Sequence, residues 1–262
     1  MEKGQCKLCL NENVDLLTRS HIIPKFLFED MKDENNSFIQ IEPNKYVKGR
    51  KQHIKKPRDA FHESNILCGN CDGIVLKEYE DYLKLVFHST TKSVSRPLFV
   101  KRVQEKRGFN ILHIENVNYK LYKLGFLSIL WRASISNLNF FNIVNLGPHS
   151  ELIRKILLKG EQFDESEYPF FTSFFNQIND EYQVVLPITK FKMYNYTHYR
   201  FIINGLDIIF MIGGKDLKMN PNLLEYVPNF QGKLKIIEHK ENYGKDMILS
   251  IINKNEDFRA KY

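Results

Sequence analysis

Two cysteine pairs in this chain have the spacing of a metal site. Cys6 and Cys9 form the first pair, Cys68 and Cys71 form the second, and the 262 residues contain no other cysteine. Two residues between the cysteines let one tight turn present both thiolates to a metal, and four sulfur ligands suit tetrahedral Zn²⁺. The alternatives are a redox-active pair, which normally occurs once, or two disulfides, which need an oxidising compartment. The repeated spacing predicts one structural zinc.

A histidine lies between the two pairs, in the segment Ser20-His21-Ile22-Ile23-Pro24. We expect a short strand that stops at the proline, because proline cannot donate to a β-ladder. His21 is then near the end of that strand. After the second cysteine pair, apolar residues recur at three- and four-residue spacing up to Phe87, which predicts a helix that begins at Asp72.

Positive charge is concentrated between the two pairs. Seven basic residues and no acidic residue lie between Lys45 and Arg58, and these seven charges equal the net charge of +7. Such a run is either a solvated loop or a surface that contacts a phosphate backbone. Because the run lies within the loop that a shared zinc would close, we interpret it as a set of nucleic-acid phosphate contacts. The candidates are Lys48, Arg50, Lys51, Lys55, Lys56 and Arg58.

The order of these motifs resembles the HNH endonuclease superfamily in its zinc-bound ββα-metal form. The family pattern is C-x-x-C, then D-H-x-x-P, then N-L-x-x-C-x-x-C-N, and the similarity covers about residues 1–90. The chain is closest to HNH-like bacterial proteins with a Ser-His-Ile-Ile-Pro signature. The resemblance implies an N-terminal treble-clef module, DNA or alternatively RNA as substrate, and a role in defence against foreign DNA.

The resemblance also implies roles for individual residues. His21 would be the general base that takes a proton from the attacking water, and Asn65 would keep its imidazole oriented. Asp72, at the start of the helix, would bind a catalytic Mg²⁺ or Mn²⁺, since hard cations prefer oxygen ligands. Ser20 stands where the family has a metal-binding Asp, and Asp72 stands where it often has Asn. Either the two changes compensate, with Ser20 as a neutral ligand and Asp72 as an anionic ligand of the catalytic metal, or the site has lost its catalytic metal.

Two other residues near the site have open interpretations. His62 is either a second base or phosphate contact, or a polar loop residue. Glu80 either assists a metal from the helix that Asp72 begins, or is solvated or ion-paired. The segment from Pro24 to Asn65 is longer than in compact HNH modules and must carry an insertion.

Residues 91–262 are expected to form a separate mixed α+β domain with a recognition or regulatory role. Asn204-Gly205 is the strongest hairpin signal in the chain. The phenylalanine pairs at 170–171 and 174–175 are either base-stacking platforms or core residues. The predicted helices are an amphipathic one over 118–137, one over 150–158 with Ser150 as its N-cap and Gly160 as its stop, and one over 247–253. The predicted strands are 170–175, 182–188, 199–203, 206–212 and 233–238.

The sequence as a whole predicts an α+β protein that is a metal-dependent HNH-type endonuclease. Two rival classes are a zinc-stabilised nucleic-acid-binding protein without activity and a zinc-scaffolded protein-interaction module. A partner protein or a second copy of the chain would bind through residues 91–262. We expect a cytoplasmic protein with no membrane partner, because the start of the chain lacks a signal-peptide pattern and Arg132 interrupts the longest apolar helix.

Overall fold

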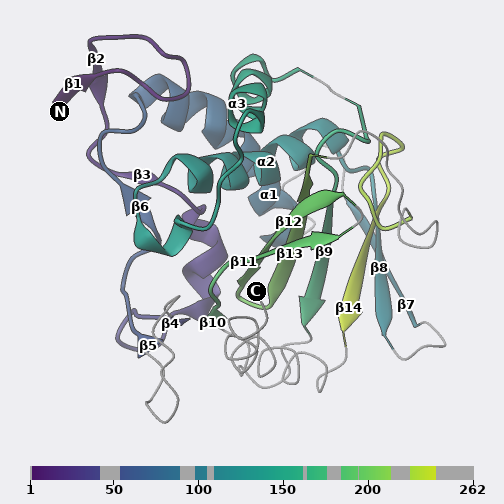
Figure 1. Ribbon diagram of the computed structural model, residues 1–262. Helices are drawn as coiled ribbons and strands as arrows, with labels where there is room; N and C mark the ends of the chain where they lie inside the picture. The colour runs from purple at the N-terminus through teal and green to yellow at the C-terminus, as the bar shows by residue number, and fades with distance from the viewer. Residues whose placement is uncertain are drawn as a thin grey trace.

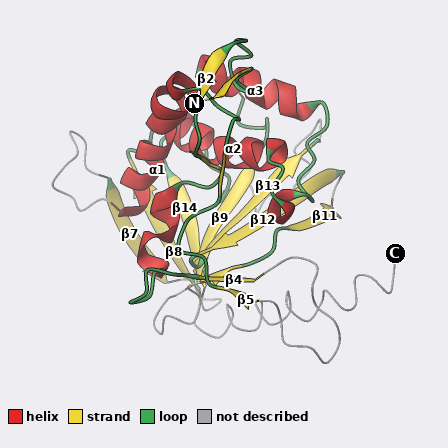
Figure 2. Ribbon diagram, turned by 90° about the vertical axis from the view of Figure 1, so that its left-hand side faces the viewer, coloured by secondary structure: helices red, strands yellow, loops and turns green. Residues whose placement is uncertain are grey.

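A large mixed sheet with helices gathered on one of its faces dominates the structure (Figures 1 and 2). This computed structural model describes residues 2–41, 54–88, 98–104, 109–161, 164–175, 184–193, 195–213 and 225–239. The combination of helices with parallel and antiparallel strand pairs confirms the predicted mixed α+β class. Within the described part of the chain, no helix is both long and apolar enough to cross a membrane.

The first 88 residues are built from short strands, helical turns and one longer helix. β1 and β2 form an antiparallel hairpin, and β3 pairs antiparallel with β6 from the far end of the predicted insertion. Helical turn η1 lies within that insertion, and the π-helical turn η2 runs directly into α1. The bounds are β1 Glu2–Gly4, β2 Val14–Leu16, β3 Ser20–His21, η1 Lys25–Met31, β4 Ile39–Ile41, β5 Ile54–Lys55, β6 His62–Glu63, η2 Cys71–Leu76 and α1 Lys77–His88.

The large sheet draws strands from both halves of the chain. Its order is β5-β4-β10-β12-β13-β9-β14-β8-β7, and β11 also pairs with β12. The pairs β4–β10 and β9–β14 are parallel, and the others are antiparallel. The bounds are β7 Phe99–Gln104, β8 Asn110–Glu115, β9 Phe170–Phe175, β10 Val184–Val185, β11 Thr189–Met193, β12 Tyr196–Ile203, β13 Leu206–Ile212 and β14 Leu234–His239.

Helix α2 (Tyr119–Ile135) lies at the centre of the fold. Its N-cap is Asn118, whose side chain accepts a hydrogen bond from the backbone N–H of Leu121 at 3.2 Å. The expected amphipathic pattern is wrong, because every residue from position 122 to position 133 is buried, including Lys123 and Arg132. The helix packs against both α1 and α3 (His149–Lys159) as well as the sheet. A helix covered on all sides needs no polar face.

Two turn predictions are confirmed and one cap is corrected. Asn204 and Gly205 have φ values of 52° and 72° and connect β12 to β13, as a hairpin turn of this type requires. Gly160 ends α3 in a left-handed conformation, with φ of 60°. The N-cap of α3 is Pro148 rather than Ser150, and the helix begins at His149.

The two predicted domains share a core and a sheet. One cluster of buried side chains runs from Cys6 through the helices to Ile236. β4, from the first range, is paired with β10, from the second. Residues 1–90 and 91–262 therefore pack together where the structure describes them, and the boundary near residue 90 stays a prediction.

Several elements differ from the sequence-based expectation. β7, β8 and β11 were not expected, and the strand predicted over 182–188 is limited to Val184–Val185 in the described part. A short 3₁₀ turn, η3 (Asn139–Phe141), follows α2. The helix predicted over 247–253 lies outside the described residues.

Candidate zinc centre and histidine site

The four cysteines meet at one place. Their sulfur atoms all lie within 4.8 Å of one another, although the two pairs are separated by about 60 residues of sequence, and none is in a disulfide. Cys6 and Cys9 lie in the loop of the β1–β2 hairpin, and Cys71 opens η2. Four close sulfurs, two of them on fully buried residues, fit a closed structural zinc site. The cluster could therefore hold a metal ion such as Zn²⁺.

Backbone hydrogen bonds hold the two cysteine loops together. The N–H of Lys7 donates to the carbonyl of Ile66 at 2.9 Å, and the N–H of Cys68 points at the sulfur of Cys6 at 3.4 Å. The Cys71 thiol also donates a hydrogen bond to Cys6, and this contact lowers the pKa of Cys6 and raises the pKa of Cys71. Binding of a metal to both sulfurs would displace the shared proton, because the thiolate is the form that binds a metal.

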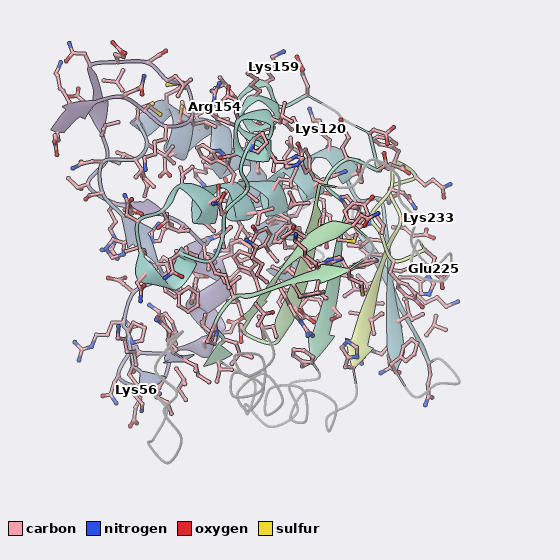
Figure 3. All side chains as sticks on the ribbon, viewed as in Figure 1. Lys56, Lys120, Arg154, Lys159, Glu225 and Lys233 are labelled. Carbon is pink, nitrogen blue, oxygen red and sulfur yellow. The ribbon has the colours of Figure 1, made fainter. Side chains whose placement is uncertain are left out.

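The second half of the chain holds the first cysteine loop in place. The ammonium group of Lys7 donates to the carbonyl of Ile135, at the end of α2, at 2.9 Å. The guanidinium of Arg154, in α3, donates to the carbonyl of Leu8 and also pairs with Glu151. The cysteine cluster is therefore anchored to two helices that lie beyond residue 91, and Figure 3 labels Arg154 on one of them.

His21 lies opposite a second histidine. β3 and β6 pair so that His21 is directly across from His62, and their ring centres are 6.3 Å apart. Directly opposed residues of an antiparallel pair project from the same face. Both side chains are half-buried. His62 is thus a strand residue at the site rather than a loop residue, which the sequence could not show because the pairing spans the insertion.

A buried arginine connects His21 to the helices. Arg132 is 1% exposed and donates to the backbone carbonyl of His21 at 2.6 Å. Its guanidinium also forms an ion pair with Glu80 of α1 at 2.5 Å and donates to Ser128 one turn earlier in α2. The ion-paired interpretation of Glu80 is confirmed. The only sequence signal for Arg132 was a charged residue within an apolar helix.

Burial sets the protonation preference of two candidate residues. Burial lowers the pKa of His21. The charge of Glu80 opposes this shift, whereas the charges of Arg19, His62 and Arg132 reinforce it. A neutral imidazole can accept a proton, which is what a general base must do. Burial also raises the pKa of Asp72 to about 6. The charge of Arg132 acts to lower this pKa, and the charge of Glu80 acts to raise it further.

The residues expected to bind a catalytic metal do not form a ready-made site. Among the described residues, the four cysteines are the only group of three or more His, Cys, Asp or Glu side chains close enough to share a metal. Ser20 is fully buried, and its hydroxyl has no hydrogen-bond partner in the described part. Asp72 is half-buried at the start of η2, and Glu80 is held by Arg132. The described side chains therefore give no support for the implied Mg²⁺ or Mn²⁺ site, which stays a prediction.

Asn65 lies where the chain turns from β6 toward the second cysteine pair. Its φ of 61° is left-handed, a conformation that asparagine tolerates better than most residues. Its backbone N–H donates to the carbonyl of Leu17, and its side-chain amide donates to Glu2 at 2.5 Å. These contacts hold the segment after β6 against the β1–β2 hairpin. The expected role in orienting His21 stays a prediction.

The basic stretch is described only in part. Lys48, Arg50 and Lys51 lie outside the described residues, whereas Lys55, Lys56 and Arg58 are exposed on and after β5. Lys56 lies at the opposite end of the molecule from Arg154, which contacts the first cysteine loop (Figure 3). These cations therefore belong to the segment that carries the insertion. Their role as phosphate contacts stays a prediction.

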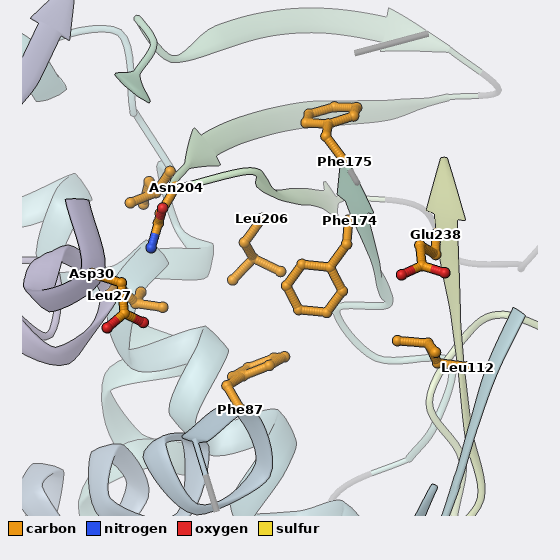
Figure 4. Close-up of a pocket in the computed structure, with 10 residues that line it drawn as sticks. Leu27, Asp30, Phe87, Leu112, Phe174, Phe175, Asn204, Leu206 and Glu238 are labelled. Carbon is orange, nitrogen blue, oxygen red and sulfur yellow. The ribbon is translucent and has the colours of Figure 1, made fainter. Parts of the chain in front are cut away.

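A separate pocket of about 330 Å³ lies on the large sheet. Figure 4 shows the carboxylates of Asp30 and Glu238 on opposite sides of it, with apolar side chains between them. Glu238 is buried and accepts hydrogen bonds from Arg102 and Asn110, each at 2.8 Å. The lining residues are Leu27, Asp30, Phe87, Leu112, Phe174, Phe175, Ile203, Asn204, Leu206 and Glu238. Phe174 and Phe175 both line this pocket. Phe175 is also buried, and Phe174 is half-buried.

Comparisons with known proteins give no match. No protein-family model, no curated protein and no solved structure is significantly similar to this chain. The resemblance to HNH nucleases accordingly rests on the motifs and their order.

Proposed function

We propose that this protein is a zinc-stabilised HNH-type endonuclease that cleaves phosphodiester bonds in nucleic acid, with His21 as the general base. The observation that carries the proposal is the order of the ββα unit. His21 lies on a strand, the opposing strand follows the insertion, and the second cysteine pair then opens the helix. Burial favours the neutral form of His21, as its role requires.

The substrate we propose is a nucleic acid: the resemblance points to DNA, with RNA as the alternative, and the exposed lysines and arginine near β5 provide cations for the phosphate backbone of either. A Mg²⁺ or Mn²⁺ ion, if bound at Asp72, would neutralise charge on the phosphate. We assign no step to such an ion, since the described residues do not assemble three ligands for it.

The test is cleavage of supercoiled plasmid and of RNA by the zinc-loaded protein, with and without Mg²⁺ or Mn²⁺. Wild type should cut at least one of the two substrates, and His21→Ala should reduce the rate by at least about 100-fold while binding to nucleic acid persists. His113→Ala, which removes a half-buried histidine in β8 of the large sheet, is the matched control and should cut normally. If the wild type cuts neither DNA nor RNA under any of these conditions, the nuclease proposal is wrong.

A second candidate function is nucleic-acid binding without cleavage. It is favoured by the buried Ser20 in place of a metal-binding Asp and by the ion pair that holds Glu80. Such a protein would bind DNA with a strong salt dependence and leave it intact. If it is instead a protein-interaction module, neutralising Lys48, Arg50, Lys51, Lys55 and Lys56 together would leave DNA affinity and its salt dependence unchanged.

A further inference from the structure

The two opposed histidines offer a reaction that needs no catalytic metal. We propose that His21 and His62 act as a base and acid pair on RNA, cleaving it by attack of the 2′-hydroxyl on the adjacent phosphate. This inference rests on the proposed function, because it assigns a substrate class and a second catalytic residue to the same site. The geometry of the pair carries it.

The spacing of the two rings suits one phosphate group. Two hydrogen bonds of about 3 Å each, to different oxygens of one phosphate, span roughly 6 to 8 Å between donor groups. The ring centres of His21 and His62 are 6.3 Å apart and lie on the same face of the β3–β6 pair. Neither ring of the pair is stacked flat on the other, since their planes are inclined at 63°. One phosphate can therefore contact both imidazoles.

The hydrogen bonds around the two histidines leave ring nitrogens available for proton transfer to and from a substrate. Nδ1 of His62 is 3.0 Å from the carbonyl oxygen of Ala60, and a carbonyl only accepts, so Nδ1 carries the proton of this bond. Nε2 of His62 is then the atom that exchanges a proton with substrate. The ring of His21 has no hydrogen-bond partner among the described residues, while its backbone carbonyl is held by Arg132.

The groups that this histidine pair offers suit RNA better than DNA. Hydrolysis of DNA needs an external water and a cation to neutralise the developing charge. In RNA the nucleophile is already part of the substrate, so a base, an acid and a nearby positive charge suffice. Arg19, two residues before His21, can supply this charge once a substrate phosphate takes the place of the exposed Asp59 carboxylate, which now pairs with its guanidinium at 2.5 Å.

The proposed cleavage needs no reactant other than the RNA and water. His21 takes the proton of the 2′-hydroxyl as the 2′-oxygen forms a bond to phosphorus. The bond between phosphorus and the 5′-oxygen breaks, and protonated His62 gives its Nε2 proton to that oxygen. The products are a 2′,3′-cyclic phosphate and a 5′-hydroxyl, and exchange with water restores both imidazoles.

The experiment compares three oligonucleotides of one sequence, made of RNA, 2′-O-methyl RNA and DNA. Zinc-loaded wild-type protein is assayed in buffer without added Mg²⁺ or Mn²⁺, and the ends of the products are identified. We expect only the RNA to be cut, to a 2′,3′-cyclic phosphate and a 5′-hydroxyl. His21→Gln and His62→Gln should each slow cleavage by about 100-fold or more. His113→Gln is the control for loss of a histidine elsewhere.

A modified substrate separates the acid from a merely structural residue. When sulfur replaces the bridging 5′-oxygen, the leaving thiolate needs no proton, so this RNA should restore the rate of His62→Gln but not that of His21→Gln. An unrestored His62→Gln, cleavage of 2′-O-methyl RNA, or products with 5′-phosphate ends would each overturn the inference. Cleavage of DNA alone, with Mg²⁺, would overturn it and leave the proposed nuclease function standing. No cleavage of any substrate would overturn both.

Discussion

Arg132 shows how one residue can join elements that are far apart in the sequence. Its guanidinium is buried and reaches the carbonyl of His21, the carboxylate of Glu80 and the start of its own turn at Ser128. A guanidinium has five N–H donors, so it can satisfy several buried acceptors at once, which a lysine cannot do in the same geometry. Arg132 therefore holds β3 and α1 at fixed positions relative to α2.

Replacing this arginine should destabilise the protein strongly. Arg132→Met keeps an unbranched side chain in the core but leaves Glu80 and the His21 carbonyl without their partner. We expect the free energy of unfolding to fall by about 3 kcal/mol, as for other broken buried pairs. Lys77→Met, which breaks the exposed pair with Asp81, is the control and should cost less than about 1 kcal/mol. Urea denaturation measures both, and equal losses would contradict the role assigned to Arg132.

The buried Lys123 should make the stability of the protein depend on pH. Burial lowers its pKa to about 7, although the charges of Glu167, Asp164 and Glu165 oppose the effect. The unfolded-state value is about 10.4, so between these two pH values the unfolded chain binds more protons than the folded one. The contribution of Lys123 to stability is therefore lowest below pH 7 and rises as the pH increases toward 10.

Urea denaturation of wild type and Lys123→Met between pH 6.5 and 9.5 tests this sign. The wild type should gain stability relative to Lys123→Met as the pH rises through this window. The difference between the two proteins isolates Lys123, because the other groups titrate in both. Lys120→Met, on the same helix, controls for the loss of a positive charge (Figure 3). Parallel stability curves for wild type and Lys123→Met would show that the buried amine keeps an ordinary pKa.

At the scale of elements, local sequence signals succeeded where the contact was local. The cysteine spacing, the Asn204-Gly205 turn and the glycine stop of α3 each depend on a few neighbouring residues, and each is present in the structure. Long-range pairings gave no such signal. The placement of His62 depends on β3–β6 pairing across the insertion, and the burial of α2 on all sides depends on what packs against it.

The β12–β13 turn gives a prediction at this scale. Gly205 has φ of 72°, so an added Cβ carries the left-handed penalty, and Gly205→Ala should destabilise the protein by about 1–2 kcal/mol. Gly73→Ala is the matched control. It lies in η2 with nothing within 4 Å of its new Cβ, and the better helix propensity of alanine should stabilise the protein by up to about 1 kcal/mol. Thermal unfolding of both variants checks the opposite signs.

For the whole molecule, the zinc centre and the sheet belong to one continuous core. Cys6 and Cys71 are members of the same buried cluster as the residues of α2 and the central strands. Lys7 and the loop around Leu8 are hydrogen-bonded to α2 and α3. The single tryptophan, Trp131, lies in α2 and is 1% exposed, so its fluorescence reports on the part of the fold beyond residue 91.

Loss of the metal should therefore shift the unfolding transition that Trp131 fluorescence reports. We expect wild type to bind one Zn²⁺ per chain and Cys9→Ser to lose it. Because zinc binding is coupled to folding, removing the metal should lower the unfolding temperature reported by Trp131 by at least about 10 °C. Ser64→Ala, an exposed change near the second cysteine pair, is the control. If zinc is released while the Trp131 transition does not move, the cysteine module unfolds on its own, and the two halves are energetically separate domains despite their shared core.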